Sequence, residues 1–179
     1  MAKKEAKLDS KGYRKFGMRD KVAYAAGDLG CNMSFGLKGT VQTFWLVFMM
    51  METGLFSLLL LLVQAWDAIN DPLWGIIVDT RRPTKNGKFR PYLMTVSVPL
   101  GISTALCFLN VQNYISSYAM LLAFAYITYC VYGMLYTGIN IPYGSLASAI
   151  TDDPNGRTLL STMRSIGAGV GGAAVTLVA

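Results

Sequence analysis

The sequence predicts an all-α integral membrane protein with about five transmembrane helices. Hydrophobic residues make up 53% of the 179 residues, charged residues make up 15%, and the mean hydropathy is +0.40. A soluble domain is closer to a quarter charged and less than half apolar. The apolar residues also form blocks of about 20 residues or more, the length of helix that crosses the ~30 Å hydrocarbon core of a bilayer. We therefore expect a multi-pass protein of a cell membrane, the plasma or inner membrane, surrounded by lipid.

Five apolar blocks give the expected spans in order: residues 22–51, 55–78, 92–111, 118–150 and 159–179. The third and fourth blocks contain no charged residue, and only Asp67 and Asp71 interrupt the second. Residues 151–157 contain aspartate, proline, asparagine and glycine, which favour a turn between the last two spans. The fifth block is still apolar at residue 179, so we expect residues 22–179 to be an incomplete N-terminal bundle of a longer protein.

Basic residues collect on one side of the predicted topology. Eight of the sixteen Lys and Arg precede residue 22, and five more lie in residues 81–90, whereas residues 52–54 and 112–117 contain none. This positive-inside asymmetry predicts a cytoplasmic N-terminus, with residues 1–21 as a basic cytosolic tail. It also argues against a nucleic-acid partner, which the net charge of +6 would otherwise suggest.

The sequence offers no ligand set for zinc and no other sign of a cofactor. It has no histidine, and Cys31, Cys107 and Cys130 lie inside apolar blocks without a CxxC pair. Structural zinc sites combine cysteine and histidine ligands at close spacings. We expect the cysteines to be packing residues and expect no cofactor.

Charged side chains inside the spans are the strongest functional signal. Each costs at least ~2.5 kcal/mol at the bilayer centre, so such groups persist only where they face a bundle interior or an aqueous cavity. They are Asp28, Lys38, Asp67, Asp71 and Arg164. A substrate or ion pathway is the expected role of the group, and structural ion pairing is the alternative, above all for Lys38.

The second span concentrates oxygen ligands on one helical face. In the run WDAINDP, Asp67, Asn70 and Asp71 lie three and four positions apart, on the same side of a helix. Two carboxylates suit a hard cation, and like charges one turn apart favour either a bound cation or a shared proton. Pro72 frees a nearby backbone carbonyl as a further ligand. The pattern predicts a site for a coupling ion, held by Asp67 and Asp71 if that ion is Na⁺.

The fourth span carries a polar and aromatic stripe that suits a sugar. Tyr132, Tyr136, Asn140 and Tyr143 recur at helical spacing near Pro142. Sugars bind where amides and carboxylates meet hydroxyls and where aromatic rings cover the apolar ring faces. The alternative is a belt of aromatic residues at the membrane interface.

A third cluster connects the second and third spans on the predicted cytoplasmic side. It begins with the pattern Gly-x-x-x-Asp and continues with basic residues, and its members are Gly75, Asp79, Arg81, Lys88 and Arg90. An acid at the end of one span and bases before the next can latch neighbouring helices, so we expect a cytoplasmic latch here.

These motifs together resemble the glycoside–pentoside–hexuronide:cation symporters, a branch of the major facilitator superfamily that includes melibiose permease. The resemblance rests on Gly27-Asp28, on WDAINDP at residues 66–72, on GKFRP at residues 87–91 and on NIPYGSL at residues 140–146. It runs from about residue 20 to the end of the chain. It implies twelve spans in two six-helix halves, so this chain corresponds to a truncated six-helix N-terminal half with the C-terminal half absent.

The resemblance also implies roles for individual residues. Asp67, Asn70, Asp71 and Thr137 would form the cation site, and Asp28, Tyr136, Asn140 and Arg164 would face the sugar. Two positions depart from melibiose permease: Asn140 replaces an aspartate and Gly144 replaces a tryptophan. These departures argue against melibiose and favour a glucuronide or xyloside, with the galactoside class still open.

The function predicted from the sequence is therefore symport of a sugar or glycoside, driven by Na⁺, H⁺ or Li⁺. Two alternatives come from other classes of protein. One is a truncated membrane fragment that does not transport, because alternating access needs the missing half as a partner. The other is an intramembrane aspartyl enzyme using Asp67 and Asp71, which is less favoured because catalytic pairs usually come from different helices.

Overall fold

The computed structural model describes residues 16–84, 87–115 and 117–178. These residues form five α-helices: α1 (Met18–Val47), α2 (Thr53–Thr80), α3 (Arg90–Cys107), α4 (Tyr118–Ile150) and α5 (Pro154–Val178). No strand occurs among the described residues, where the one β-bridge joins Thr84 and Gly87. The all-helical class is confirmed. Most of the predicted cytosolic tail, residues 1–15, lies outside the described residues.

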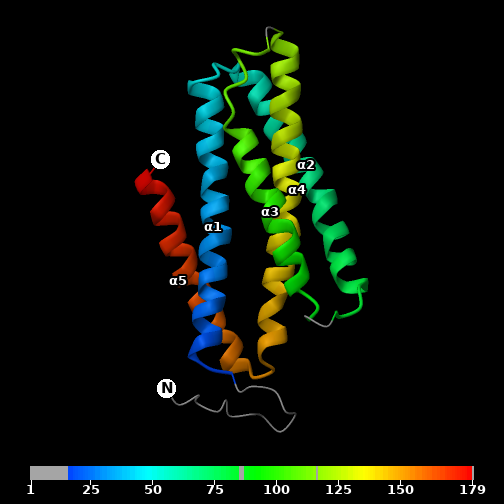
Figure 1. Cartoon of the computed structure of the whole chain (residues 1–179), viewed down its shortest axis with the longest axis vertical. Coiled ribbons are helices and arrows are strands. Elements are labelled where there is room, and N and C mark those ends of the chain that lie inside the picture. The colour runs from blue at the N-terminus through cyan, green and yellow to red at the C-terminus, as the bar shows by residue number, and fades with distance from the viewer. Residues whose placement is uncertain (1–15, 85–86, 116, 179) are drawn as a thin grey trace.

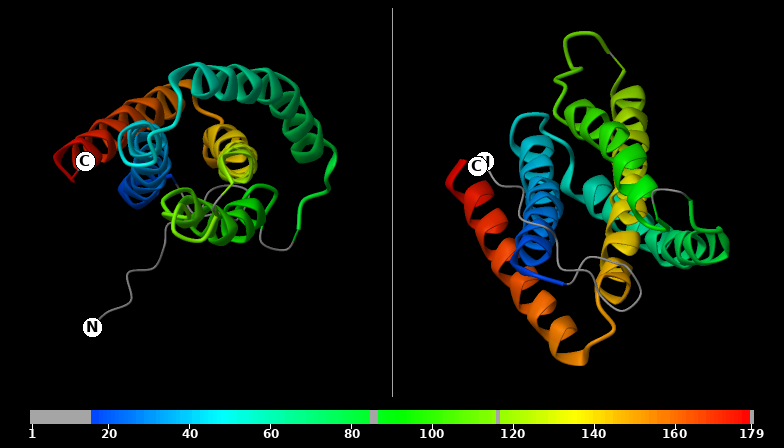
Figure 2. Two further views of the ribbon diagram at one scale, coloured as in Figure 1. Left: turned by 90° about the horizontal axis from the view of Figure 1, so that it is seen from above. Right: turned by 60° about the horizontal axis from the view of Figure 1, so that its bottom comes forward.

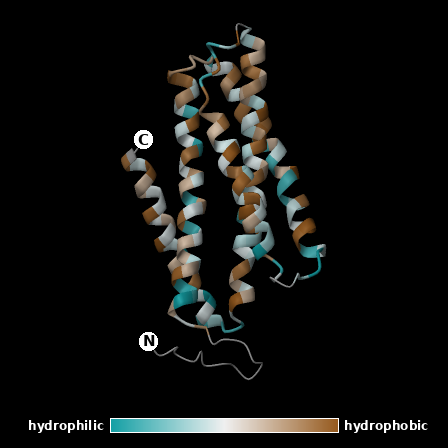
Figure 3. Cartoon of the chain, viewed as in Figure 1, coloured by the Kyte–Doolittle hydropathy of each residue, from teal (hydrophilic) through white to brown (hydrophobic). Residues whose placement is uncertain are grey.

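Two of the five helices, α2 and α4, are long and apolar enough to cross a membrane by composition alone. At about 1.5 Å per residue, both exceed the ~30 Å of a hydrocarbon core. Polar and charged residues lower the hydropathy of α1 and α5, and α3 has only 18 residues. Figure 3 shows the resulting mixture of polar and apolar surface along α1 and α5.

The helix ends differ from the predicted spans where a capping group decides the boundary. Residues 154–157, predicted to be a loop, form the first turn of α5. Asp153 Oδ2 accepts a hydrogen bond from the backbone N–H of Gly156 at 2.9 Å, and Pro154 suits the first helical position. At the other end of the chain α1 begins at Met18, because Asp20 Oδ2 accepts from the Gly17 N–H at 3.0 Å.

The helices pack as two groups that meet on α4. In one group α5 lies along α1, and in the other α2 and α3 both pack on α4 (Figures 1 and 2). Small residues permit the first of these contacts, because α1 and α5 approach closely at Gly167 and Gly171. Contacts of α1 with α4 join the two groups, so α4 borders every other helix.

The connections divide between the two ends of the bundle. Figure 1 shows the α1–α2 and α3–α4 connections at one end, and the start of α1 with the α2–α3 and α4–α5 connections at the other. At the first end the indole of Trp45 is 1% exposed and donates to the Cys107 carbonyl at 3.0 Å. The fully buried ring of Tyr129 meets it edge-on.

Candidate functional site

The first polar centre joins α1 and α5 through an ion pair. Arg164 Nε lies 2.9 Å from Asp28 Oδ1, and the Asp28 side chain is 1% exposed. Asn32, one turn further along α1, donates from Nδ2 to Asp28 Oδ2 at 2.7 Å. Both carboxylate oxygens of Asp28 therefore have a donor, which a buried charge requires. The structure brings together two residues, 136 positions apart, that the sequence analysis assigned to the sugar side.

Two tyrosines form the wall of this first centre. The rings of Tyr24 and Tyr143 stack with their centroids 4.7 Å apart, and the Tyr143 hydroxyl donates to the Tyr24 carbonyl. The Arg164 guanidinium lies over the Tyr143 ring at 5.4 Å, in cation–π geometry. The guanidinium is thus held between a carboxylate and an aromatic face, while 39% of the Arg164 side chain is exposed.

The second polar centre lies where α2 meets α4 and α1. Asp67 Oδ2 is 3.9 Å from Lys38 Nζ, and each side chain is 26% exposed. Lys38 also lies over the Tyr129 ring at 5.5 Å. The other carboxylate oxygen, Asp67 Oδ1, is buried and has no hydrogen-bond partner among the described residues. This oxygen faces α4 at Gly133, where a methyl group would come within 3.3 Å of it.

The remaining predicted cation ligands lie on α2 and α4. The Thr137 hydroxyl donates to Asp71 Oδ1 at 3.0 Å, which joins the two helices. Asn70 is 4% exposed, and its Nδ2 has no partner among the described residues. No cluster of three His, Cys, Asp or Glu side chains occurs in the described part of the chain. The predicted ligands on these helices are two carboxylates, an amide and a hydroxyl, and such oxygen groups suit a hard cation.

A row of tyrosines on α4 runs from the second centre towards the first. Tyr129 stacks with Tyr132 at 6.2 Å, and Tyr132 stacks with Tyr136 at 6.4 Å. Tyr136 also meets Phe35 of α1 at 6.0 Å. Tyr136 and Asn140 are both half-buried, and the side-chain amide of Asn140 forms no hydrogen bond with the described residues. An amide with unused donors and acceptors beside aromatic rings can receive a sugar hydroxyl.

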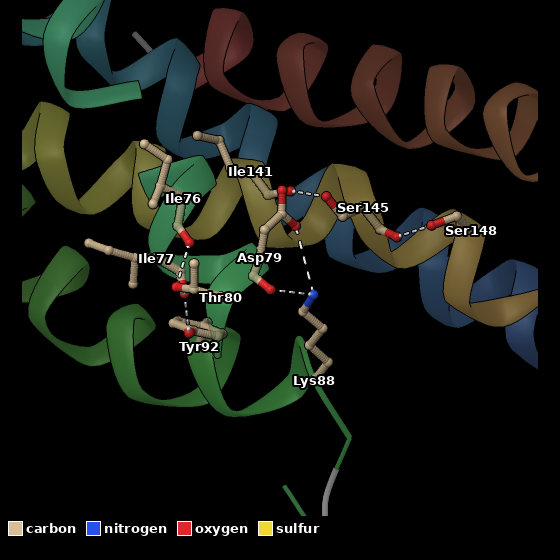
Figure 4. Close-up of polar contacts among 9 residues, drawn as sticks. All are labelled: Ile76, Ile77, Asp79, Thr80, Lys88, Tyr92, Ile141, Ser145 and Ser148. Atoms are coloured by element: carbon tan, nitrogen blue, oxygen red, sulfur yellow. Dashed lines mark hydrogen bonds and ion pairs between the residues drawn. The ribbon is translucent and has the colours of Figure 1, made fainter. Parts of the chain in front are cut away.

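The predicted latch is assembled in part. Lys88 Nζ lies 3.7 Å from Asp79 Oδ1 and donates to the Asp79 carbonyl at 3.2 Å, as Figure 4 shows. Arg81 and Arg90 form no ion pair with Asp79 in the described structure, and a methyl group at Gly75 would meet no atom within 4 Å. Asp79 is 80% exposed, so the pair is a surface contact.

Sequence reasoning missed the partners that hold these side chains in place. Lys38 was noted as an intramembrane charge, but its position beside Asp67 depends on how α1 packs against α2 and α4. Asn32 offered a usable signal, because it lies four positions after Asp28 and so on the same helical face. Tyr24 offered none, since its ring stacks on Tyr143, 119 positions away in the chain.

The comparison with known proteins identifies the family of this chain. A family described as "MFS/sugar transport protein" matches residues 23–179. The chain belongs to this family. The resemblance to glycoside–pentoside–hexuronide symporters is thereby confirmed, and the chain falls among transport proteins, not enzymes.

Three relatives illustrate the match. An isoprimeverose transporter of Lactiplantibacillus pentosus is 32% identical over 89% of this chain and 33% of its own length. A glucuronide carrier protein homolog of Escherichia coli is 34% identical over 82% of this chain and 32% of its own length. The inner membrane symporter YicJ of Escherichia coli is 32% identical over 87% of this chain and 33% of its own length. The chain therefore spans about a third of the length of these relatives, and family membership supports a membrane location.

Proposed function

We propose that this chain is the N-terminal part of a cation-coupled symporter for a sugar or glycoside. In this proposal all five helices span the membrane, as part of a six-helix half that a second half completes. The N-terminus and the α2–α3 and α4–α5 connections face the cytoplasm, in agreement with the basic residues at that end. The isoprimeverose and glucuronide relatives support a glycoside substrate, in the glucuronide, xyloside or galactoside class.

One observation carries the proposal: two neighbouring residues of α4 contact different parts of the candidate site. Thr137 donates to Asp71, and Tyr136 continues the tyrosine row beside Asn140 and lies against Phe35 of α1. A shift of α4 that improves one set of contacts must also change the other. In this proposal α4 is the element through which the two ligands influence each other.

The charge balance of the second centre supports a role for a monovalent cation in this proposal. Asp67 and Asp71 carry two negative charges, and Lys38 offsets one of them from 3.9 Å. One charge remains, on a site with a buried and unpaired oxygen at Asp67. A bound Na⁺, Li⁺ or H⁺ would neutralise it and would favour the arrangement that binds sugar. By linkage, sugar must then raise the affinity for the cation by the same factor.

The test is uptake of radiolabelled glycosides by vesicles that contain the complete gene product. Glucuronides, xylosides and galactosides are compared with a sodium gradient, a lithium gradient, a pH gradient and no gradient. Uptake of one sugar class that rises with a cation gradient is the expected result. Sugar uptake that is the same under every ion condition would overturn the coupling, and no uptake of any glycoside would overturn the transport function.

The cation site predicts a specific response to loss of one carboxylate. Asp71→Asn should raise the cation concentration for half-maximal uptake by about tenfold or more, because an amide cannot neutralise a cation. Thr137→Val, which removes the hydroxyl bonded to Asp71, should raise it by about two- to threefold. Thr128→Val on the same helix is the matched control, since the Thr128 hydroxyl bonds within α4 and to Cys107 of α3, and not to Asp71. Equal cation dependence in all three variants would exclude Asp71 and Thr137 from the site.

The proposed sugar-binding role of Asn140 predicts that its substitution changes the selectivity among glycosides and not the coupling to the cation. Asn140→Asp introduces a carboxylate, which accepts stronger hydrogen bonds from sugar hydroxyls than an amide does. We expect the order of preferred glycosides to change. The ratio of affinities for the best two substrates should shift by about tenfold, and the cation dependence of uptake should not change. Competition by a panel of unlabelled glycosides measures this directly. An unaltered order would remove Asn140 from the sugar pocket.

A further inference from the structure

A cavity lies between α2 and α3, at the end of the bundle where these helices are joined. It encloses about 370 Å³ and is lined by Trp74, Ile77, Arg81, Arg82, Lys88 and Tyr92 among others. The cavity exists because α2 and α3 each pack on α4 and not along each other. Figure 4 shows the α3 side chain of Tyr92 reaching Ile77 of α2, where its hydroxyl donates to the Ile77 carbonyl at 3.4 Å.

The positive charge of this cavity is only partly balanced. Lys88 is paired with Asp79 at 3.7 Å, which satisfies one of the three cations. Arg81 and Arg82 are exposed and form no ion pair within residues 16–84, 87–115 and 117–178. Each guanidinium is a planar group with several N–H donors, a geometry that suits phosphate oxygens.

The rest of the lining is apolar and continues onto the outer surface of the two helices. Trp74, Ile77 and Val96 lie between the arginines and the middle of the bundle. Beyond them both helices expose apolar side chains: Leu73 and Ile69 on α2, and Met94 and Val98 on α3. A free phosphate ion cannot bind to such an apolar surface, whereas the acyl chains of a lipid can pack against it.

We propose that this cavity binds an anionic phospholipid of the cytoplasmic leaflet. The phosphate of the head group is held by Arg81 and Arg82, and the acyl chains lie along the exposed faces of α2 and α3. Tryptophan and tyrosine are the residues that border the head-group region of membranes, which fits the positions of Trp74 and Tyr92. Basic pockets between membrane helices on the cytoplasmic side recognise anionic head groups by the same chemistry.

The assignment rests on the proposed membrane orientation, but it is independent of the sugar and cation centres. A bound lipid would join α2 to α3 where the described residues supply two contacts between Lys88 and Asp79 and one long hydrogen bond from Tyr92 to Ile77. It would thereby stabilise the α2–α3 connection.

Native mass spectrometry of the complete gene product in detergent, titrated with phosphatidylglycerol and with phosphatidylcholine, tests the proposal. We expect phosphatidylglycerol to bind at least about tenfold more tightly than phosphatidylcholine, since each arginine near the membrane surface favours an anionic lipid. Arg81→Gln with Arg82→Gln should weaken that binding about 30-fold. Arg157→Gln is the control, because Arg157 is a basic residue in the first turn of α5 and is 48% exposed. It should leave binding unchanged.

Three outcomes would overturn the site. They are equal binding of the two lipids by the unmodified protein, equal weakening by Arg157→Gln, and complete displacement of phosphatidylglycerol by excess inorganic phosphate. The first comparison needs no variant, so it stands even if the double variant fails to fold. Cation-stimulated uptake by the same protein in vesicles is scored separately. Lipid selectivity without uptake would defeat the symporter alone, and uptake without lipid selectivity would defeat the lipid site alone.

Discussion

Asp28→Asn is expected to lower the free energy of unfolding by about 3 kcal/mol, the largest single effect that we predict for a side-chain charge. The variant leaves Arg164 without its counter-charge and weakens the hydrogen bond from Asn32. We take the lower end of the range for a broken buried pair, because the Arg164 side chain is 39% exposed. Thermal unfolding of the purified complete gene product measures the change.

A matched control separates this effect from loss of any carboxylate. Asp152→Asn breaks the pair with Arg157, in which the atoms are 3.9 Å apart and Asp152 is 92% exposed. Surface pairs of this kind contribute little, so the unfolding temperature should not change measurably. Similar unfolding temperatures for Asp28→Asn and Asp152→Asn would show that the pair between α1 and α5 does not stabilise the bundle.

A double variant distinguishes support of the fold from contact with sugar. Asp28→Leu with Arg164→Leu replaces the pair by apolar side chains, which is often neutral or stabilising for a buried pair. We expect the double variant to unfold near the temperature of the unmodified protein. We also expect it to show no sugar binding by calorimetry. Recovery of sugar binding in the double variant would restrict Asp28 and Arg164 to a structural role.

The sequence was sufficient for properties that depend on neighbours along the chain. Apolar block length predicted all five helices, and the boundaries of α4 agree with the predicted span to the residue. Asp79 and Lys88 come together because Lys88 lies in the short connection that follows the end of α2. The start of α5 was misplaced because apolarity was weighed above capping, although Asp153 and Pro154 are a usual helix start.

The contacts that could not be predicted are those that depend on how the helices pack against one another. A period of 3.6 residues places Asp28 and Lys38 on faces of α1, but it does not say that one meets α5 and the other α2. The unpaired oxygen of Asp67 is likewise a property of packing, since it results from the position of Gly133 on another helix. The two polar centres are thus assembled by contacts between segments more than 25 residues apart.

The contact between α1 and α5 predicts the second large effect, at a residue that carries no charge. Gly167 lies against the backbone carbonyl of Ala25 so closely that a methyl group there would overlap the oxygen. Backbone cannot move aside as a flexible side chain can, so Gly167→Ala must push the two helices apart. We expect a loss of about 1–3 kcal/mol, the usual cost of overfilling a packed contact. Thermal unfolding of the complete gene product measures it.

The same displacement should reach the first polar centre. Arg164 is three residues before Gly167, and Asp28 is three residues after Ala25, so both lie about one helical turn from the overlap. Moving the helices apart therefore lengthens the 2.9 Å contact between Arg164 Nε and Asp28 Oδ1. Sugar affinity should fall in Gly167→Ala together with stability.

Gly169→Ala on the same helix is the matched control, because a methyl group there would meet no atom within 4 Å. Alanine favours a helix over glycine by up to about 1 kcal/mol, so this variant should be as stable as the unmodified protein or more stable. A decrease of stability and sugar affinity in Gly167→Ala alone would show that the closeness of α1 and α5 sets the geometry of the Asp28–Arg164 pair. If both variants instead behave alike, helix propensity governs these glycines, and the ion pair must be positioned by its own contacts with Asn32 and Tyr143.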